Sequence, residues 1–236
     1  MIIDCVSDLH GFKPKLEGGD LLIVAGDCTA RDTITQWKEF FDWFKAQAYR
    51  KKVLVGGNHD GFLECCATTK ECREIYNEFC ESDREFILGD GERFEFLDEG
   101  YEYLEDTGTE FEGLKIWGSP WTPEFCGWHF MLPRGEELKK KWDLIPDDTD
   151  ILITHGPPWG VMDNVCNSFS RKDNQGCEEL RSALDRVKPK LHVFGHIHEG
   201  YGQLLLKHDG PNTMCVNAAI MDRFYQPVNK PIRIVL

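Results

Sequence analysis

Five clusters of histidine, carboxylate and amide side chains each follow a short apolar run in this sequence. The runs are Ile2–Ser7, Leu21–Ala25, Val53–Val55, Ile151–Thr154 and Leu191–Phe194, and each is typical of a strand covered on both faces. Loops at the carboxyl ends of parallel strands meet at one edge of a sheet, so the clusters are expected to converge there. The clusters are Asp8-Leu9-His10, Gly26-Asp27, Gly57-Asn58-His59-Asp60, His155-Gly156 and Gly195-His196-Ile197-His198.

The remaining segments predict helices and further strands. Expected helices span Asp32–Gln47, with Thr33 and Gln36 as a capping box, and then Leu63–Cys80, Leu138–Leu144 and Glu178–Val187. Alternation in Glu85–Trp117, carried by Phe94, Phe96, Tyr101, Tyr103, Phe111, Leu114 and Ile116, predicts antiparallel strands, and Leu204–Leu206, Met214–Val216 and Ile232–Leu236 predict three more. The pattern favours an α/β fold in which one domain, residues 1–236, holds two packed sheets with helices outside.

Composition narrows the range of partners. The net charge of −14, from 41 acidic and 27 basic residues, disfavours a nucleic-acid polymer as partner, and binding of a small phosphate ester then requires local positive charge such as metal ions. No apolar run approaches a membrane span and the amino-terminal segment does not resemble a signal peptide, so a cytoplasmic protein without membrane contact is expected. Ten cysteines without a Cys-x-x-Cys pair favour reduced, packed thiols, and the sequence does not specify an oligomeric state.

The clusters differ in how strongly each indicates chemistry. Asp8-Leu9-His10 or Gly26-Asp27 alone is more often a turn, whereas Gly195-His196-Ile197-His198 places two imidazoles two residues apart after a strand, a common metal-binding arrangement. Five such clusters in one chain, each after a strand, predict a functional site.

With these clusters, the sequence resembles the calcineurin-like metallophosphoesterases, and within them the metallophosphoesterase-domain-containing (fetal-brain protein) subfamily. Asp150–Pro158, Gly118–Pro123, Leu132–Gly135 and Pro189–Gly202 carry the closer resemblance. It implies a four-layer sandwich of two mixed β-sheets flanked by helices. It also implies two divalent metal ions bridged by Asp27, one with Asp8, His10 and His198, the other with Asn58, His155 and His196.

The resemblance further implies the roles of other residues. A hydroxide between the ions would be the nucleophile, His59 the general acid, and Asp60 the residue that holds the His59 imidazole in the right tautomer; the alternative for Asp60 is a helix or turn cap. All metal ligands offer nitrogen or oxygen, which suits manganese first and iron or zinc as alternatives.

Two further residues are candidates for substrate contact. Arg134 is expected either to contact a phosphate or to form a structural salt bridge. Trp121, Trp128 and Trp159 lie in Gly/Pro-rich loops, and Trp159, beside Gly156-Pro157-Pro158, is the first choice for a substrate contact, with core or rim packing as the alternative.

The subfamily resemblance implies a phosphodiesterase acting on small esters, cyclic nucleotides first. The alternatives are a phosphomonoesterase or phosphoprotein phosphatase and a non-enzymatic scaffold module. The protein phosphatases usually carry Asp-Arg-Gly soon after the bridging aspartate and Glu-Arg-type residues after Asn-His, and these arginines bind the phosphate. This chain instead has Cys28-Thr29-Ala30-Arg31 after Asp27, and Asp60-Gly61-Phe62 after His59, which counts against a protein phosphatase.

Overall fold

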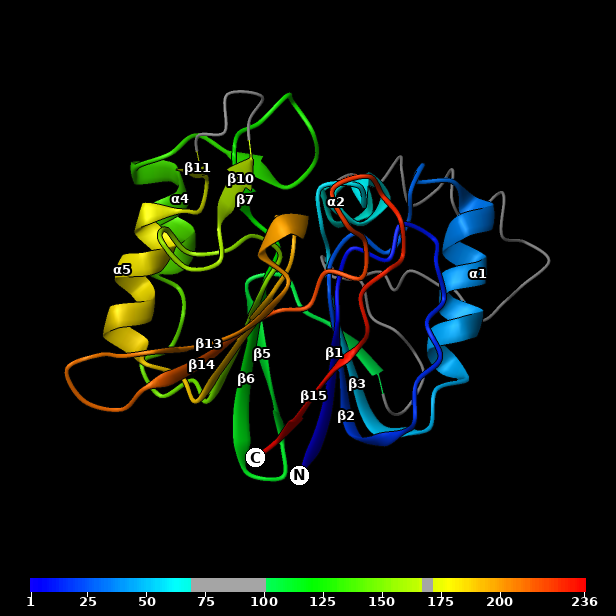
Figure 1. Cartoon of the computed structure of the whole chain (residues 1–236), viewed down its shortest axis with the longest axis horizontal. Helices are drawn as coiled ribbons and strands as arrows, with labels where there is room; N and C mark the ends of the chain where they lie inside the picture. Colours follow the sequence, from blue (N-terminus) through cyan, green and yellow to red (C-terminus); the bar gives the residue numbers. More distant parts are fainter. Residues whose placement is uncertain (69–100, 167–171) are drawn as a thin grey trace.

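Two mixed β-sheets pack face to face, with helix α1 on the outer face of one and helices α4 and α5 on the outer face of the other (Figure 1). The computed structural model describes residues 1–68, 101–166 and 172–236. The arrangement confirms the expected α/β sandwich of two mixed sheets flanked by helices.

The first sheet has the strand order β15-β1-β2-β3-β4. Its parallel strands are β1 (Ile2–Val6), β2 (Gly19–Ala25), β3 (Tyr49–Val55) and β4 (Tyr101–Tyr103), with β15 (Ile232–Val235) antiparallel at one edge. The antiparallel pairing expected around Tyr101 is wrong, because β4 lies parallel to β3 with Tyr103 beside Leu54. The strand residues expected at Phe94 and Phe96 lie outside the described residues.

The second sheet has the strand order β13-β14-β12-β9-β6-β5. Its parallel strands are β6 (Leu114–Ser119), β9 (Ile151–Thr154), β12 (Leu191–Phe194) and β14 (Thr213–Asn217), and β5 (Thr107–Phe111) and β13 (Gly202–Leu206) are antiparallel edges. Two short pairs not expected from the sequence lie in loops: β7 (Thr122–Pro123) with β8 (Met131–Leu132), and β10 (Asn164–Cys166) with β11 (Lys172–Asn174).

The helices follow the apolar spacing of the sequence. They are α1 (Ile34–Lys45), α2 (Gly61–Thr68), α4 (Glu136–Trp142), α5 (Glu178–Val187) and the 3₁₀ turn η1 (His198–Gly200). Before α1, Thr33 Oγ1 accepts a hydrogen bond from Gln36 N, but the Gln36 side chain accepts from Arg31 N, so half of the expected capping box forms. The part of the expected Leu63–Cys80 helix beyond Thr68 lies outside the described residues.

Three apolar clusters account for the layers. Between the sheets, Ile23 and Val53 of the first sheet pack with Ile153 and Val193 of the second. The outer clusters join α1 to the first sheet through Trp37, Phe41 and Phe44, and α4 and α5 to the second through Leu138, Trp142 and Leu184. Burial of such a side chain stabilises the fold by about 1.5–3 kcal/mol, so the sheets form a rigid support for the loops that leave them.

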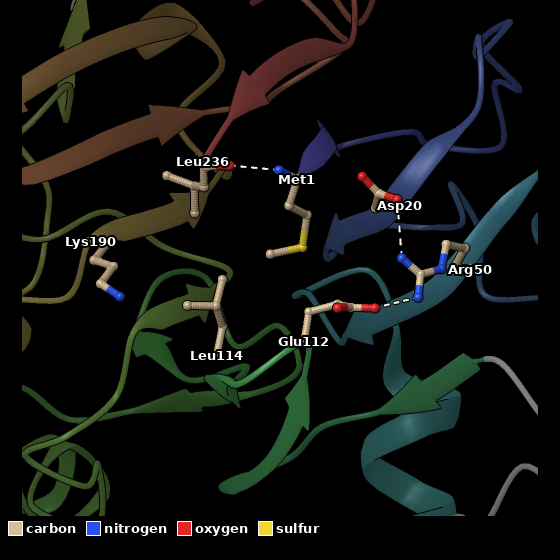
Figure 2. A pocket seen from close by; sticks show the side chains of 7 residues that line it. All are labelled: Met1, Asp20, Arg50, Glu112, Leu114, Lys190 and Leu236. Carbon is tan, nitrogen blue, oxygen red and sulfur yellow. Dashed lines mark hydrogen bonds and ion pairs between the residues drawn. The ribbon is translucent and has the colours of Figure 1, made fainter.

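A pocket of about 560 Å³ lies near the amino-terminal ends of the parallel strands (Figure 2). Met1, Asp20, Arg50, Glu112, Leu114, Lys190 and Leu236 line it. Its arginine forms ion pairs with Asp20 and Glu112, and its lysine with Asp150, so both cations are neutralised. The polar clusters lie at the other ends of the same strands. Within the described residues, no helix is long and apolar enough to cross a membrane.

Candidate metal centre

Loops from both sheets converge at the carboxyl ends of their parallel strands. Asp8 and His10 follow β1, Asp27 follows β2, and Asn58 follows β3. From the second sheet, His155 follows β9, and His196 and His198 follow β12. A chain of contacts connects these seven residues, running from His198 through Asp8, His196, Asn58, His155 and Asp27 to His10; the His196–Asp8 contact is made by the His196 backbone N–H and the others by side chains.

The first group of expected ligands is Asp8, His10 and His198. Asp8 Oδ1 lies 3.3 Å from His198 Nε2, and donor atoms from all three residues lie within 4.8 Å of one another. The side chains are nearly inaccessible to solvent, at 0%, 4% and 8% exposed respectively. A carboxylate and two imidazoles without competing water are a suitable ligand set for a transition-metal ion.

The second group centres on the Asn58 amide. Asn58 Oδ1 lies 3.0 Å from His155 Nε2 and 2.7 Å from His196 Nδ1, so the oxygen and the two ring nitrogens point at one another. Asn58 and His155 are buried. This orientation presents the amide oxygen, the expected metal-binding atom of Asn58, towards the two imidazoles.

Asp27 lies between the two groups. Its Oδ2 is 3.6 Å from His10 Nε2 in the first group, and its Oδ1 is 3.4 Å from His155 Nε2 in the second. Burial opposes ionisation of Asp27, but the charge of His155, contact with its ring and the charges of His10 and His59 outweigh it and hold the pKa of Asp27 well below its usual range. Asp27 is therefore a carboxylate whose two oxygens face different groups, the arrangement that a bridging ligand requires.

The backbone is strained at four of the seven residues. Asp8, His10, Asp27 and His196 have positive φ angles of 50°, 43°, 54° and 64°. Such angles cost on the order of 1–3 kcal/mol each and concentrate at functional sites. Glycines allow the close approach of the carboxylates: a Cβ on Gly57 would lie 2.3 Å from Asp27 Oδ1, and one on Gly195 would lie 2.0 Å from Asp8 Oδ2.

The orientation of the histidines fits a metal ion. His155 Nδ1 lies 2.9 Å from Ala25 O and His198 Nδ1 lies 2.8 Å from Asp222 O, so each Nδ1–H donates to a carbonyl and each neutral ring presents a lone pair at Nε2. Both Nε2 atoms face carboxylate oxygens, and two acceptors that face each other require a cation or a proton between them.

The pKa shifts and one orphaned ring agree with this interpretation. Burial alone would lower the pKa of His155, but the charge of Asp27 raises it to about 9, and contact with Asp8 likewise overcomes burial and raises the pKa of His198 to about 9. Both nitrogens of His10 are buried and have no hydrogen-bond partner within the described part of the chain. A divalent cation would take the place of these protons and give His10 its missing partner.

The sequence matches known proteins in the same region. The family model for calcineurin-like phosphoesterases matches residues 1–200. The chain belongs to the calcineurin-like phosphoesterase family. Membership, together with the clustered aspartates and histidines, supports a metal-dependent phosphoesterase with a dinuclear centre.

Relatives and solved structures extend the match over nearly the whole chain. Metallophosphoesterase domain-containing protein 1 of Homo sapiens is 41% identical over 235 residues, which are 98% of this chain and 70% of that protein. UPF0046 protein C25E10.12 of Caenorhabditis elegans is 34% identical over an alignment of 236 residues that covers 97% of this chain and 78% of that protein. The fold is similar to that of phosphopantetheinyl hydrolase from Mycobacterium tuberculosis, with a TM-score of 0.55 at 13% identity, 98% coverage of this chain and 95% of that chain.

In this calcineurin-like phosphoesterase, His59 lies beside Asp27, the expected bridging ligand. Its backbone N–H donates to Asp27 Oδ1 at 2.8 Å, and its ring centroid is 4.6 Å from that of His10. Its Nδ1 lies 3.3 Å from Ala30 O. Donor atoms of His10, Asp27 and His59 also lie within 4.8 Å of one another, so the geometry alone permits His59 either as a ligand or as a proton donor.

Asp60 differs from the expectation that it holds the His59 imidazole. Its carboxylate accepts hydrogen bonds from Cys28 N, Thr29 N and Gly57 N at distances from 2.9 to 3.3 Å, and the His59 ring faces Ala30 O instead. Adjacent side chains in a loop point in different directions, and the Asp60 side chain points towards the loop that carries Asp27. Burial and the charge of Asp27 raise the pKa of Asp60 to about 8. Asp60 therefore matches the alternative, a turn cap.

The two expected substrate contacts lie together. Arg134 donates to Gln175 O and Gly176 O at 2.8 and 2.7 Å, pairs with Glu178, and lies 6.0 Å from the ring of Trp159. Within the described ranges, neither Arg134 nor Trp159 makes a hydrogen bond or ring contact with the seven ligands. Contact of either residue with substrate stays a prediction, and for Arg134 the salt-bridge alternative is present.

Two other aromatic residues make ring contacts with histidines of the site. Trp128 packs against His59, with ring centroids 4.3 Å apart, and Tyr225 packs against His10 and His198, with centroids 4.9 and 5.1 Å apart. The sequence indicated Trp128 only as one of three loop tryptophans, and Tyr225 follows no cluster that would have identified it. Both are more than two-fifths exposed, at 46% and 55%.

Proposed function

We propose that this protein hydrolyses small phosphodiesters, with cyclic nucleotides as the first candidates. The position of Asp27 between two groups of nitrogen and oxygen ligands, with His59 beside it, carries the proposal. Asp8, His10 and His198 would hold one divalent ion, and Asn58, His155 and His196 the other, with Asp27 shared. Manganese is proposed first because the donor set contains nitrogen and oxygen without thiolate, and iron and zinc are the alternatives.

When bound, two such ions would acidify water and neutralise charge on the phosphoryl oxygens. The protein contributes fixed positions: buried carboxylates, rings oriented by Ala25 O and Asp222 O, and a loop held by Asp60. His59 would hold a proton for the leaving oxygen. Because its Nδ1 faces Ala30 O, its Nε2 is the atom that would carry that proton.

Charge favours a diester over a monoester. A phosphate monoester is a dianion near neutral pH, whereas a diester carries one negative charge, so a monoesterase needs more positive charge around the phosphate. In the described parts of the chain, no lysine or arginine forms a hydrogen bond or ion pair with any of the seven ligands. The proposal therefore takes the diester first, and the phosphomonoesterase or phosphoprotein phosphatase stays the alternative that the assay below distinguishes.

The test compares manganese-dependent hydrolysis of bis-(p-nitrophenyl) phosphate and p-nitrophenyl phosphate on one preparation, with its metal content measured. Faster turnover of the diester with about two ions per chain is expected. Faster turnover of the monoester would replace the proposal with a phosphatase. No turnover, with fewer than one ion bound after reconstitution, would overturn the enzyme proposal in favour of the non-enzymatic scaffold module. Within a successful assay, hydrolysis of 3′,5′- and 2′,3′-cyclic nucleotides tests the substrate class.

A further inference from the structure

Trp128 forms a partly exposed platform against the proposed general acid. Its ring centroid lies 4.3 Å from that of His59 with 34° between the planes, so part of its surface covers the imidazole. The side chain nevertheless stays 46% exposed. An exposed indole surface therefore lies directly beside the group that would protonate the leaving oxygen.

The loop that carries Trp128 is fixed to the metal-ligand loops. Cys126 and Gly127 turn the backbone with φ angles of 55° and 68°. After the turn, His129 N donates to Asn58 O at 3.3 Å, and Glu64 at the start of α2 accepts from Phe130 N at 3.2 Å. The position of the indole is thus tied to the backbone of Asn58, an expected ligand.

Tyr225 forms a second aromatic wall, over the first group of ligands. Its ring centroid lies 4.9 Å from that of His10, 5.1 Å from that of His198 and 6.5 Å from that of His59. The side chain is 55% exposed, and the backbone at Tyr225 has a φ of 57°, a strained value for an aromatic residue.

Asp222 holds the loop of Tyr225 in this strained form. Its carboxylate accepts from Phe224 N and Gln226 N at 2.8 and 2.9 Å. Its carbonyl oxygen accepts from Tyr225 N at 2.9 Å and faces Nδ1 of His198 at 2.8 Å. One residue therefore positions both a metal ligand and the aromatic ring that packs on it.

We infer that Trp128 and Tyr225 form an aromatic subsite that binds a planar ring in the organic part of the phosphate ester. The inference rests on the proposed function, because it places the leaving group beside His59. A leaving oxygen within reach of His59 puts its organic group next to the rings that pack on His59 and on the first group of ligands. A flat π-bearing group, aryl or nucleobase, gains from stacking there, and one such contact strengthens binding by about tenfold.

Neighbouring aromatic residues provide matched controls. Phe125, in the loop of Trp128, is 63% exposed, and Phe224, beside Tyr225, is 65% exposed. Phe224 packs under Arg223, and neither phenylalanine has a ring contact with a site histidine in the part of the chain described. General surface hydrophobicity would make all four aromatic residues contribute alike, whereas the aromatic subsite requires Trp128 and Tyr225 alone.

The experiment measures binding of phenylphosphonate and methylphosphonate to the manganese-loaded protein by calorimetry. Both are non-hydrolysable and carry the same anionic group, so the ratio of their affinities isolates the ring. The wild-type protein is expected to bind phenylphosphonate about tenfold more tightly. Trp128→Leu and Tyr225→Leu should each lower that ratio at least about threefold, while methylphosphonate affinity stays within about twofold. Trp128→Phe should keep most of the wild-type ratio. The controls Phe125→Ala and Phe224→Ala should leave the ratio unchanged.

Adenosine 5′-monophosphate against ribose 5-phosphate then separates a nucleobase subsite from an aryl subsite. A larger ring effect for the nucleotide pair assigns the subsite to nucleobases; a larger effect for the phosphonate pair assigns it to smaller aryl groups. A wild-type ratio near one in both pairs, or a ratio unchanged in Trp128→Leu and Tyr225→Leu, overturns the subsite, while diester hydrolysis on the same sample leaves the proposed function intact. Failure of both hydrolysis and phosphonate binding overturns the two together.

Discussion

The backbone N–H of His196 donates to both carboxylate oxygens of Asp8, at 3.1 and 2.9 Å, across 188 positions of sequence. Asp8 follows a strand of the first sheet and His196 a strand of the second. The two residues also belong to different groups of expected ligands. The position of the Asp8 carboxylate in the first group of ligands therefore depends on how the two sheets pack, because a loop of the second sheet holds it.

Gly195 makes this contact possible, and Gly195→Ala is expected to damage the first group of ligands. The added Cβ would lie 2.0 Å from Asp8 Oδ2 and 2.1 Å from Ser7 Oγ, so the carboxylate has to move. We expect metal affinity or activity to fall by about 10–100-fold, as for other changes that displace a ligand. Metal analysis and calorimetric titration measure it. Gly113→Ala is the control, because its Cβ meets nothing within 4 Å and its φ of 76° confines the strain to the β5–β6 turn; equal metal affinity in both variants would contradict the prediction.

Asp27→Ala is expected to weaken both metal sites, because the two carboxylate oxygens face His10 and His155 in different groups. His10→Ala is the matched comparison and should weaken the first site only. Metal stoichiometry after dialysis distinguishes them: fewer than one ion for Asp27→Ala and about one for His10→Ala, as a two-metal centre with one shared ligand requires. Retention of two tightly bound ions by Asp27→Ala would show that Asp27 does not bridge.

Asp60→Ala is expected to destabilise the fold. The substitution leaves the buried amides of Cys28, Thr29 and Gly57 without their acceptor, and each unsatisfied buried donor costs about 1–3 kcal/mol. A decrease of about 3 kcal/mol or more in the free energy of unfolding should follow, measured by urea denaturation. A variant of normal stability that loses only its rate would instead support the role of orienting His59.

The strands and the polar clusters that follow them could be predicted because each signal is local, whereas the assignment of those residues as metal ligands came from the family resemblance. An apolar run such as Ile151–Thr154 specifies a strand buried on both faces, and the polar residue that follows it, His155, must lie at the edge of the sheet. The spacing of Trp37, Phe41 and Phe44 specifies the inner face of α1 in the same way. None of these conclusions required knowledge of a distant partner.

Other features depend on contacts between distant segments. The direction of β4 is set by its pairing with β3, since a strand of three residues carries no signal of its own orientation. Asp60 follows His59 directly, yet its carboxylate accepts from Cys28 N and Thr29 N in the loop after β2, and from Gly57 N in its own loop. The contact of Tyr225 with His10 joins opposite ends of the chain, and only the folded backbone around Asp222 brings it about.

His192 is expected to make folding stability depend on pH. Its Nε2 lies 2.9 Å from Thr154 Oγ1, which donates to Gly156 O, so the neutral ring donates from Nε2, and burial lowers its pKa to about 3. The unfolded chain takes up this proton below about pH 6.5, and the folded chain does not, so stability falls as pH falls. The group should remove about 1.4 kcal/mol between pH 7.5 and 5.5.

The measurement is the difference between the wild-type protein and His192→Gln in free energy of unfolding at the two pH values. Subtraction removes the contribution of the ligand histidines, whose shifts differ in direction. A difference that stays constant with pH would show that His192 binds the same number of protons in the folded and unfolded states over this range.

His59→Ala distinguishes the two roles that the geometry permits. A proton donor should leave about two ions bound and lose roughly 10²–10⁴ in rate, with the larger loss for esters whose leaving group is a strong base. Bis-(p-nitrophenyl) phosphate, with a weakly basic leaving group, should therefore suffer less than a cyclic nucleotide, whose leaving alkoxide needs the proton. Rates and metal content are measured on the same samples, with His129→Ala, a histidine 49% exposed on the neighbouring loop, as the control. If His59→Ala loses an ion and slows both substrates equally, His59 is a ligand alongside His10 and Asp27, and another group must supply the proton.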